Sequence, residues 1–250
     1  MNQKSSQRNE VGATRREMLH GTLGATLALG VGQSLAASSA HASTGGEGSA
    51  AALSSGHQAI LDRLMEGNQR FISGHLRKHD MANARGILAK GQRPDTAVIR
   101  CADSRVAPEL VFDQNLGELF VCGVAGNIPT PELMASIEYA VAVLGTRMIL
   151  IMGHSSCGAV DAAIQHQTDV GALPGSLPGL IAQILPSVLK AQKTPGDTLA
   201  HSIKQNSMDA ASRLTKMSTV VEEAVNQGEV GIASGVYELS SGRFIVNSPS

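Results

Sequence analysis

The pattern of apolar and polar positions predicts an amphipathic helix followed by two buried strands. In "AILDRLMEGNQRFI", residues 59–72, apolar side chains recur at helical spacing and fall largely on one face, with Gly67 as a candidate break. The runs at 96–100 and 118–125 are apolar without alternation. Such runs are typical of strands that are covered on both faces, as in a parallel sheet.

A helix with clear end signals separates the second strand from a third. Pro131 follows Thr130, a residue type that favours the N-cap, and Gly145 closes the segment "PELMASIEYAVAVLG". Residues 147–153, "RMILIMG", then favour a strand. Strand, helix and strand in this order form the crossover unit of a parallel sheet.

The C-terminal part adds helices and a hairpin. A connection rich in Pro and Gly at 172–179 leads to helical segments at about 180–192 and 199–227. The last segment, "GIASGVYELSSGRFIVN", predicts two short strands joined at residues 240–242. We therefore predict an α/β fold, with a mostly parallel β-sheet flanked by helices and a C-terminal edge hairpin.

The N-terminal residues have the features of an export signal. Arg15 and Arg16 precede a mildly apolar segment, and "AHA" at 40–42 offers a small-residue cleavage site. The apolar segment at 22–37 is Gly-rich and shorter than the roughly 20 apolar residues that a membrane span needs. The pattern predicts export through the twin-arginine machinery to the periplasm, cleavage after about Ala42, and no stable membrane anchor.

The predicted organisation is a twin-arginine signal peptide at 1–42, a flexible low-complexity linker at 43–55 and one domain at 56–250. The charge of the whole 250-residue chain is balanced, with 20 Lys and Arg against 21 Asp and Glu, and the sequence contains no basic block. Surfaces that bind nucleic acid need clustered cations, so we expect no nucleic-acid partner.

Cysteine and histidine side chains follow two of the predicted strands. Cys101 comes directly after the strand at 96–100, His154 directly after the strand at 147–153, and Cys157 three residues later. Because the carboxyl ends of parallel strands meet at one edge of a sheet, these side chains should converge. Two thiolates and one imidazole suit a tetrahedral zinc ion whose fourth position stays open for water or substrate.

Two other interpretations of the cysteines remain. One is a closed structural zinc site, which usually takes ligands from paired C-x2–4-C knuckles, and the other is a redox pair, which usually forms C-x-x-C; the sequence has neither motif.

Asp103 and Arg105 lie just past the first strand. Alone they would be an ordinary ion pair, but beside zinc the arginine can hold the carboxylate, which can accept a hydrogen bond from a zinc-bound hydroxide.

These residues carry a family resemblance. "CADSR" at 101–105 and "GHSSCGAV" at 153–160 resemble the two signatures of the β-class carbonic anhydrases. The resemblance extends in order and spacing to "EGNQRF", "GQRP", "ELVFDQNLGELFV", "AGN" and "SIEYAV", and covers about 60–246.

The resemblance assigns roles to seven residues. It implies that Cys101, His154 and Cys157 bind one zinc ion per subunit and that Asp103 and Arg105 form the catalytic dyad. It further implies that Gln92 and Gly158 lie on the substrate side of the site.

The resemblance also implies a reaction and an assembly. The reaction is the reversible hydration of carbon dioxide to bicarbonate and a proton by a zinc-bound hydroxide. The assembly is a homodimer or a dimer of dimers, with sites near the subunit interface and the N-terminal helix embracing the partner.

Three positions depart from the family pattern. Where the family usually has an Arg in "VVRNAGN", this chain has "VCGVAGN", so an interaction of that Arg is missing or replaced by Cys122 and Gly123. We interpret Cys122 as a buried strand thiol, with a redox partner as the alternative. Members with an inhibitory bicarbonate pocket have a Trp where this chain has Val98. This difference indicates an always-open site with Asp103 held by Arg105; Asp103 as a fourth zinc ligand would instead close the resting site.

Two other functions remain open at this stage. The same scaffold and zinc site could act on carbonyl sulfide or carbon disulfide. A non-catalytic zinc or redox-sensing protein, with Cys122 as the responsive thiol, is the alternative from another class.

Overall fold

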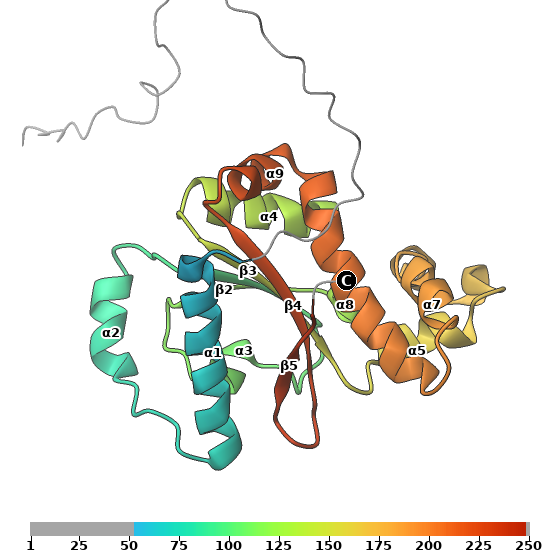
Figure 1. The fold of residues 1–250 in the computed structure, drawn as a ribbon, viewed down its shortest axis with the longest axis horizontal. Coiled ribbons are helices and arrows are strands. Elements are labelled where there is room, and N and C mark those ends of the chain that lie inside the picture. Colours follow the sequence, from blue (N-terminus) through green and yellow to red (C-terminus); the bar gives the residue numbers. More distant parts are fainter. Residues whose placement is uncertain (1–52, 249–250) are drawn as a thin grey trace, which may run out of the picture. The chain divides into compact units, whose positions relative to one another are not determined.

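A five-stranded, mostly parallel sheet lies at the centre of the described part of the protein (Figure 1). The computed structural model describes residues 53–248, so the predicted signal peptide and most of the predicted linker lie outside it. The strand order is β2-β1-β3-β4-β5, and only β5 is antiparallel to its neighbour. The strands are β1 Thr96–Arg100, β2 Leu119–Gly123, β3 Met148–His154, β4 Gly231–Tyr237 and β5 Phe244–Val246. The predicted fold class, including the C-terminal hairpin, is confirmed.

Helices occupy both faces of this sheet. They are α1 Ser55–Ser73, α2 Met81–Leu88, α3 Pro108–Val111, α4 Pro131–Ala142, α5 Gly158–Gln165, α6 Leu177–Ile181, α7 Leu185–Ala191, α8 Thr198–Met217 and α9 Thr219–Asn226, with short 3-10 turns η2 Ala125–Asn127 and η3 Val170–Ala172. Among residues 53–248, none of these helices combines the length and apolarity that crossing a membrane requires.

Alternate residues of the central strands build two separate apolar layers. Val98 and Leu150 point to the layer that α1 and α3 cover. Ile99, Ile149 and Ile151 point to the opposite layer, which α4, α8 and α9 cover. All five side chains are fully buried, as the absence of alternation in the sequence predicted.

Helix α1 is continuous, so the break considered at Gly67 is wrong. A Cβ at this position would lie 1.8 Å from the carbonyl oxygen of Phe112. The glycine therefore lets α1 approach the backbone that follows α3. The apolar face of α1, with Ile60, Leu61 and Leu64, is buried against its own chain, so no partner subunit is needed to cover it.

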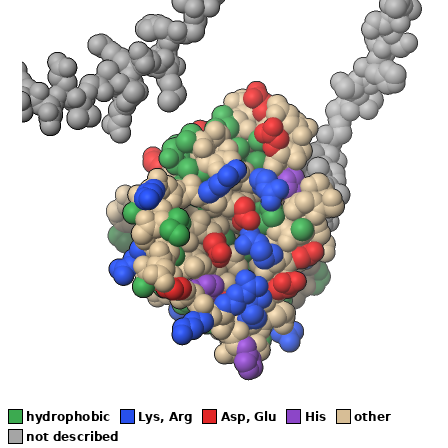
Figure 2. Space-filling view, turned by 90° about the vertical axis from the view of Figure 1, so that its left-hand side faces the viewer, with side chains coloured by type: hydrophobic (Ala, Val, Ile, Leu, Met, Phe, Trp, Pro, Cys, Tyr) green, Lys and Arg blue, Asp and Glu red, His purple; other side chains and the backbone are tan. Residues whose placement is uncertain are grey.

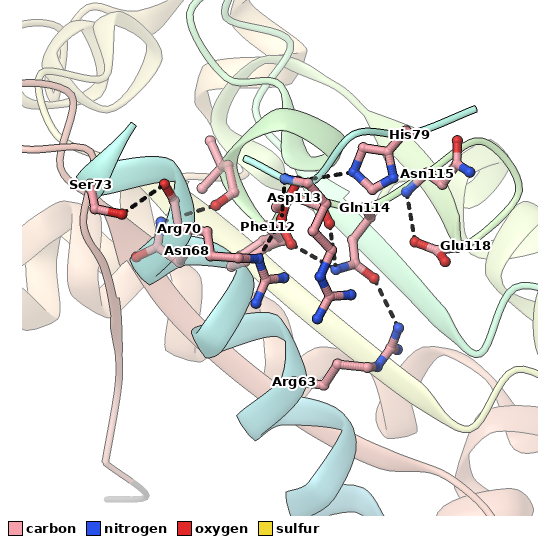
Figure 3. A network of polar contacts seen from close by, with 12 residues as sticks. Arg63, Asn68, Arg70, Ser73, His79, Phe112, Asp113, Gln114, Asn115 and Glu118 are labelled. Atoms are coloured by element: carbon pink, nitrogen blue, oxygen red, sulfur yellow. Dashed lines mark hydrogen bonds and ion pairs between the residues drawn. The ribbon is translucent and has the colours of Figure 1, made fainter. Parts of the chain in front are cut away.

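A buried carboxylate ties the segment after α1 to the segment after α3 (Figure 3). Asp113 is 2% exposed and accepts hydrogen bonds from Arg70, from the main-chain N–H of Arg77 and, at 2.9 Å, from Nε2 of His79. Burial alone would raise the pKa of Asp113, but the bonds from Arg70, His79 and Arg77 outweigh it and lower the pKa. Next to it, Gln114 accepts a 2.9 Å bond from Arg63.

Helix α2 was not predicted, and it stands apart from the core. None of its residues is buried, and Ile87 is 75% exposed. Figure 2 shows the side of the molecule that carries α2 in Figure 1, where cationic and anionic side chains are interleaved. This face is therefore not uniformly basic, which agrees with the balanced charge of the sequence.

One further expectation needs correction. The helix predicted at 199–227 is divided at Ser218, whose side chain accepts a 3.2 Å bond from Val221 N–H and caps α9. In the first turn of α1, His57 is 7% exposed, and its Nε2 bonds the carbonyl of Glu229 at 3.2 Å.

Candidate metal centre

Two parallel strands bring the predicted ligands together. β1 and β3 pair in register, so their carboxyl ends lie side by side. Cys101 follows the last residue of β1, and His154 is the last residue of β3. Cys157 occupies the N-cap position of α5. The convergence predicted from strand ends is therefore present.

The turn between His154 and Cys157 depends on a residue that sequence reasoning missed. Ser156 has a φ of 56°, a left-handed conformation that is uncommon outside glycine. The preceding Ser155 anchors this turn to the end of β4, because its N–H donates to the carbonyl of Tyr237 at 2.9 Å. The left-handed conformation of Ser156 reverses the chain within three residues, which brings the side chain of Cys157 close to that of His154.

The three side chains fit a zinc ion. The ligand atoms of Cys101, His154 and Cys157 all lie within 4.8 Å of one another, and all three residues are buried. The two Sγ atoms are 4.0 Å apart, and two thiolates on one tetrahedral zinc, with bonds of about 2.3 Å, would be roughly 3.8 Å apart. Three protein ligands leave one tetrahedral position open, as in catalytic zinc sites.

The histidine supplies the most specific sign of a metal. His154 Nδ1 bonds the carbonyl of Ser155 at 2.9 Å, which leaves Nε2 for another partner. His154 Nε2 is buried and has no hydrogen-bond partner among residues 53–248. An unpaired buried nitrogen costs free energy, whereas a ring whose other nitrogen bonds a carbonyl is the usual arrangement of a metal-bound histidine.

The electrostatics of the site favour thiolate at Cys101. The contact with Cys157, assisted by the neighbouring imidazole of His154 and the hydrogen bond from the N–H of Gly126, lowers the pKa of Cys101 to about 4. The same contact raises the pKa of Cys157, and burial adds to this shift. The two thiols thus share one proton, and a divalent cation would displace it and satisfy both sulfurs.

Asp103 and Arg105 form a well-defined pair beside these ligands. Arg105 donates from Nε to Oδ1 at 2.9 Å, from Nη2 to Oδ2 at 2.7 Å, and from its own N–H to Oδ1 at 2.9 Å. These bonds hold the pKa of Asp103 well below its usual range. Asp103 Oδ2 also lies 3.8 Å from His154 Nε2, so the carboxylate borders the space where a metal would be bound.

The two predicted substrate-side residues lie differently. Gly158 is the exposed first residue of α5, directly after Cys157, and a Cβ there would meet no atom within 4 Å. Gln92 is exposed and precedes the amino end of β1, whereas Cys101 follows its carboxyl end. Five strand residues span roughly 15 Å, so Gln92 and Cys101 flank opposite ends of β1.

An arginine on the neighbouring strand occupies the space beside Gly123. Arg100 is the register partner of Gly123. A Cβ on Gly123 would lie 3.4 Å from Cζ of Arg100, whose Nη1 donates to the carbonyl of Cys101 at 2.7 Å. Gly123, which stands where the family usually has an arginine, thus lies beside Arg100 of β1. The side chain of Arg100 in turn supports the backbone of the zinc ligand Cys101. Sequence reasoning did not identify this contact.

Cys122 belongs to a different apolar cluster from the two metal-binding cysteines. It belongs to the layer of Ile99 and Ile149, whereas Cys101 and Cys157 belong to a third apolar cluster around α5, α6 and α7. Burial raises the pKa of Cys122 to about 11. These observations agree with a buried strand thiol that is not reactive.

Comparison with known proteins agrees with this geometry. Residues 96–244 match the family model described as carbonic anhydrase. The chain is 36% identical to carbonic anhydrase 2 of Mycobacterium tuberculosis over 190 residues, which cover 75% of this chain and 91% of that protein. It is 36% identical to a carbonic anhydrase of Pseudomonas aeruginosa over 191 residues, which cover 69% of this chain and 84% of that protein.

Solved structures show the same fold. The β-carbonic anhydrase CcaA superposes with a TM-score of 0.61 at 25% identity, covering 76% of this chain and 95% of that chain. The β-carbonic anhydrase CafA of Aspergillus fumigatus superposes with a TM-score of 0.60 at 22% identity, covering 77% and 91%. With the Cys2His site, these matches show that the chain belongs to the β-class carbonic anhydrases, zinc enzymes that hydrate carbon dioxide.

Proposed function

We propose that the protein hydrates carbon dioxide at the Cys101, His154 and Cys157 site, with Asp103 and Arg105 as its catalytic dyad. The observation that carries the proposal is the buried Nε2 of His154, which has no hydrogen-bond partner in the described part of the chain and lies beside two thiols and a fixed carboxylate. Zinc bound there would lower the pKa of a water molecule and so supply hydroxide for attack on carbon dioxide near neutral pH.

The residues around the metal orient the reaction. The hydrogen bonds from Arg105 lower the pKa of Asp103 and so favour its ionised form. This carboxylate would accept a hydrogen bond from a nucleophile at the metal position and so orient it toward the substrate. Arg105 uses three hydrogen bonds to keep the carboxylate in that orientation. His154 and the cysteines hold the cation.

The resting site is open in this proposal. Arg105 holds both carboxylate oxygens of Asp103, and this ion pair supports the role of a hydrogen-bond acceptor over that of a fourth zinc ligand. Val98, where relatives with the inhibitory pocket have Trp, is fully buried within β1. Activity should therefore rise smoothly on the alkaline side without an on–off transition at lower pH.

We also propose a homodimer in which each subunit completes the site of the other. The support is the position of Gln92 at the far end of β1 from Cys101, and α2, which has no buried residue and exposes Met81 and Ile87. A dimer of dimers is compatible with the same arrangement.

Subunit complementation tests the shared site. Gln92→Ala and Cys157→Ser subunits are each expected to be nearly inactive alone. A heterodimer contains one site with zinc ligands from the first subunit and Gln92 from the second, so mixing should restore activity. No recovery, although co-purification of differently tagged subunits shows mixed dimers, would place Gln92 in its own subunit's site or outside the reaction.

Stopped-flow assays of the zinc-loaded protein test the reaction itself. We expect rapid hydration of carbon dioxide that increases from pH 6 to pH 9, and much slower turnover of carbonyl sulfide and carbon disulfide. A preference for the sulfur compounds would change the assigned substrate from carbon dioxide to carbonyl sulfide or carbon disulfide, with the same zinc chemistry. A zinc-loaded protein without any hydration activity would favour a binding or sensing role.

The location of the protein is a separate proposal that rests on the sequence of residues 1–42. We propose twin-arginine export and release into the periplasm after cleavage near Ala42. Replacement of Arg15 and Arg16 by Lys should retain the full-length chain in the cytoplasm, as measured by cell fractionation. Unchanged export of this variant would refute the twin-arginine route.

A further inference from the structure

The sulfur of Cys101 has a hydrogen-bond donor from a distant part of the chain. The main-chain N–H of Gly126, in η2, donates to Cys101 Sγ at 3.2 Å. Gly126 has a φ of 77° and a ψ of 13°, the left-handed conformation. A Cβ at this position would lie 2.6 Å from Cδ1 of Ile184. The left-handed conformation therefore favours glycine where the backbone approaches the sulfur, and a larger residue would also displace the terminal methyl of Ile184.

A buried amide fixes this glycine from its other side. Nδ2 of Asn206, on α8, donates to the carbonyl of Gly126 at 2.8 Å. Asn206 is 3% exposed and occupies the inward face of α8, a helix that packs against β3 and β4. Burying an amide on such a face is costly unless it is hydrogen-bonded, so its partner determines what it does.

The two hydrogen bonds act on one residue. The amide that points at Cys101 Sγ precedes the Gly126 Cα, and the carbonyl that Asn206 holds follows it. Fixing the carbonyl therefore limits rotation about φ and ψ of Gly126 and keeps the N–H aimed at the sulfur. Without this anchor, a glycine would have more conformational freedom than any other residue type.

We propose that Asn206 is a positioning residue of the metal centre, which acts through Gly126 to orient an N–H group toward the Cys101 thiolate. The N–H···S bond would disperse negative charge on a Cys101 thiolate and limit the directions from which its remaining lone pairs could bind a cation. The inference rests on the proposed function only in requiring that Cys101 binds a metal ion. Residues that orient ligands in this way typically change metal affinity by about 10- to 100-fold when they are replaced.

Two substitutions and one matched control test the proposal. Asn206→Leu keeps a similar volume and a good helix former but removes the donor, and Asn206→Asp keeps the shape but also removes the donor. Asn247→Ala is the control, because Asn247 donates at 2.8 Å to Ser207 Oγ, next to Asn206 on α8, and at 3.0 Å to Ser234 Oγ, and makes no described bond to Gly126. The Asn247→Ala variant therefore loses two side-chain hydrogen bonds in the same region but keeps the bond from Asn206 to the carbonyl of Gly126.

The readouts are metal affinity and a spectrum, in the full-length protein. Competition with a chromophoric chelator should show zinc bound about 10- to 100-fold more weakly by both Asn206 variants, and less than threefold more weakly by Asn247→Ala. In the cobalt-substituted protein, the thiolate-to-metal charge-transfer band should shift in the Asn206 variants only. A purely structural role for Asn206 would lower thermal stability in all three variants but leave the band unchanged.

The outcomes separate this inference from the proposed function. Asn206 variants with wild-type zinc affinity and an unshifted cobalt band would overturn the positioning role while wild-type hydration still stood. A wild-type protein that binds no zinc would instead remove the proposed function and this inference together. An equal loss of affinity in Asn247→Ala would also overturn the inference, since the effect would then follow from general loosening of α8.

Discussion

Replacing Asp103 by alanine separates zinc binding from catalysis. Asp103 borders the metal position, with Oδ2 3.8 Å from His154 Nε2, yet Arg105 engages both of its carboxylate oxygens. The variant removes the acceptor for the nucleophile's hydrogen and leaves the three metal ligands in place. We therefore expect full zinc occupancy with strongly reduced turnover.

The size of this effect follows from one hydrogen bond. A hydrogen bond to an ionised group contributes about 1.5–3 kcal/mol. If the bond operates only in the transition state, its loss lowers kcat and kcat/KM for hydration roughly 10- to 150-fold. The assays are stopped-flow hydration with a pH indicator and metal analysis of the same sample.

The matched control is Asp161→Ala on α5. Asp161 lies four residues beyond Cys157, and the one hydrogen bond that its carboxylate accepts within residues 53–248 comes from Gln165, at 2.7 Å. This variant should keep wild-type activity. A kcat/KM for Asp103→Ala within threefold of wild type would refute the role of the carboxylate, and loss of zinc in this variant would show that Asp103 is a metal ligand in a closed resting state.

Three further predictions concern stability and reactivity. Gly67→Ala should lower the free energy of unfolding in urea by about 1–3 kcal/mol or more, because its Cβ would meet the carbonyl of Phe112 at 1.8 Å; unchanged stability would mean that α1 can shift without cost. Burial raises the pKa of Cys122 to about 11, so this thiol should resist alkylation at pH 7 in the folded protein and react after unfolding. Rapid alkylation of Cys122 in the folded protein would instead support a redox role for this residue. Because the pKa of Asp113 is lowered on folding, its carboxylate stabilises the fold above the unfolded value of about 3.8 and that stability is lost as pH falls through the folded value. Asp113→Asn should therefore be less stable at pH 7 and show a flatter loss of stability below pH 4 in urea titrations, whereas an unchanged acid slope would contradict the sign of the shift.

Local pattern was sufficient to predict the sheet and the ligands. The unbroken apolar run at 96–100 became β1 with the same bounds, because a strand buried on both faces needs no alternation. His154 and Cys157 could be placed together because they are three residues apart at a strand end. Cys101 joined them because β1 and β3 pair in parallel. The crossover unit at 118–153 predicted a parallel sheet but did not predict which strands are neighbours.

The remaining features depend on partners that are distant in sequence. Asn206 is 80 residues from the carbonyl that it holds, and nothing in the local pattern of α8 distinguishes it from a solvated amide. The tight approach at Gly67 requires knowledge of where Phe112 lies. Helix α2 buries none of its residues, so it left no apolar periodicity to detect.

The central claim is that Cys101, His154 and Cys157 bind one zinc ion that drives carbon dioxide hydration. The most direct test measures zinc content and stopped-flow hydration near pH 8 for the wild-type protein and for Cys157→Ser, purified in parallel. The account predicts one zinc per subunit with rapid hydration in the wild type, and loss of both in the variant. A variant that still hydrates carbon dioxide at the wild-type rate would contradict it.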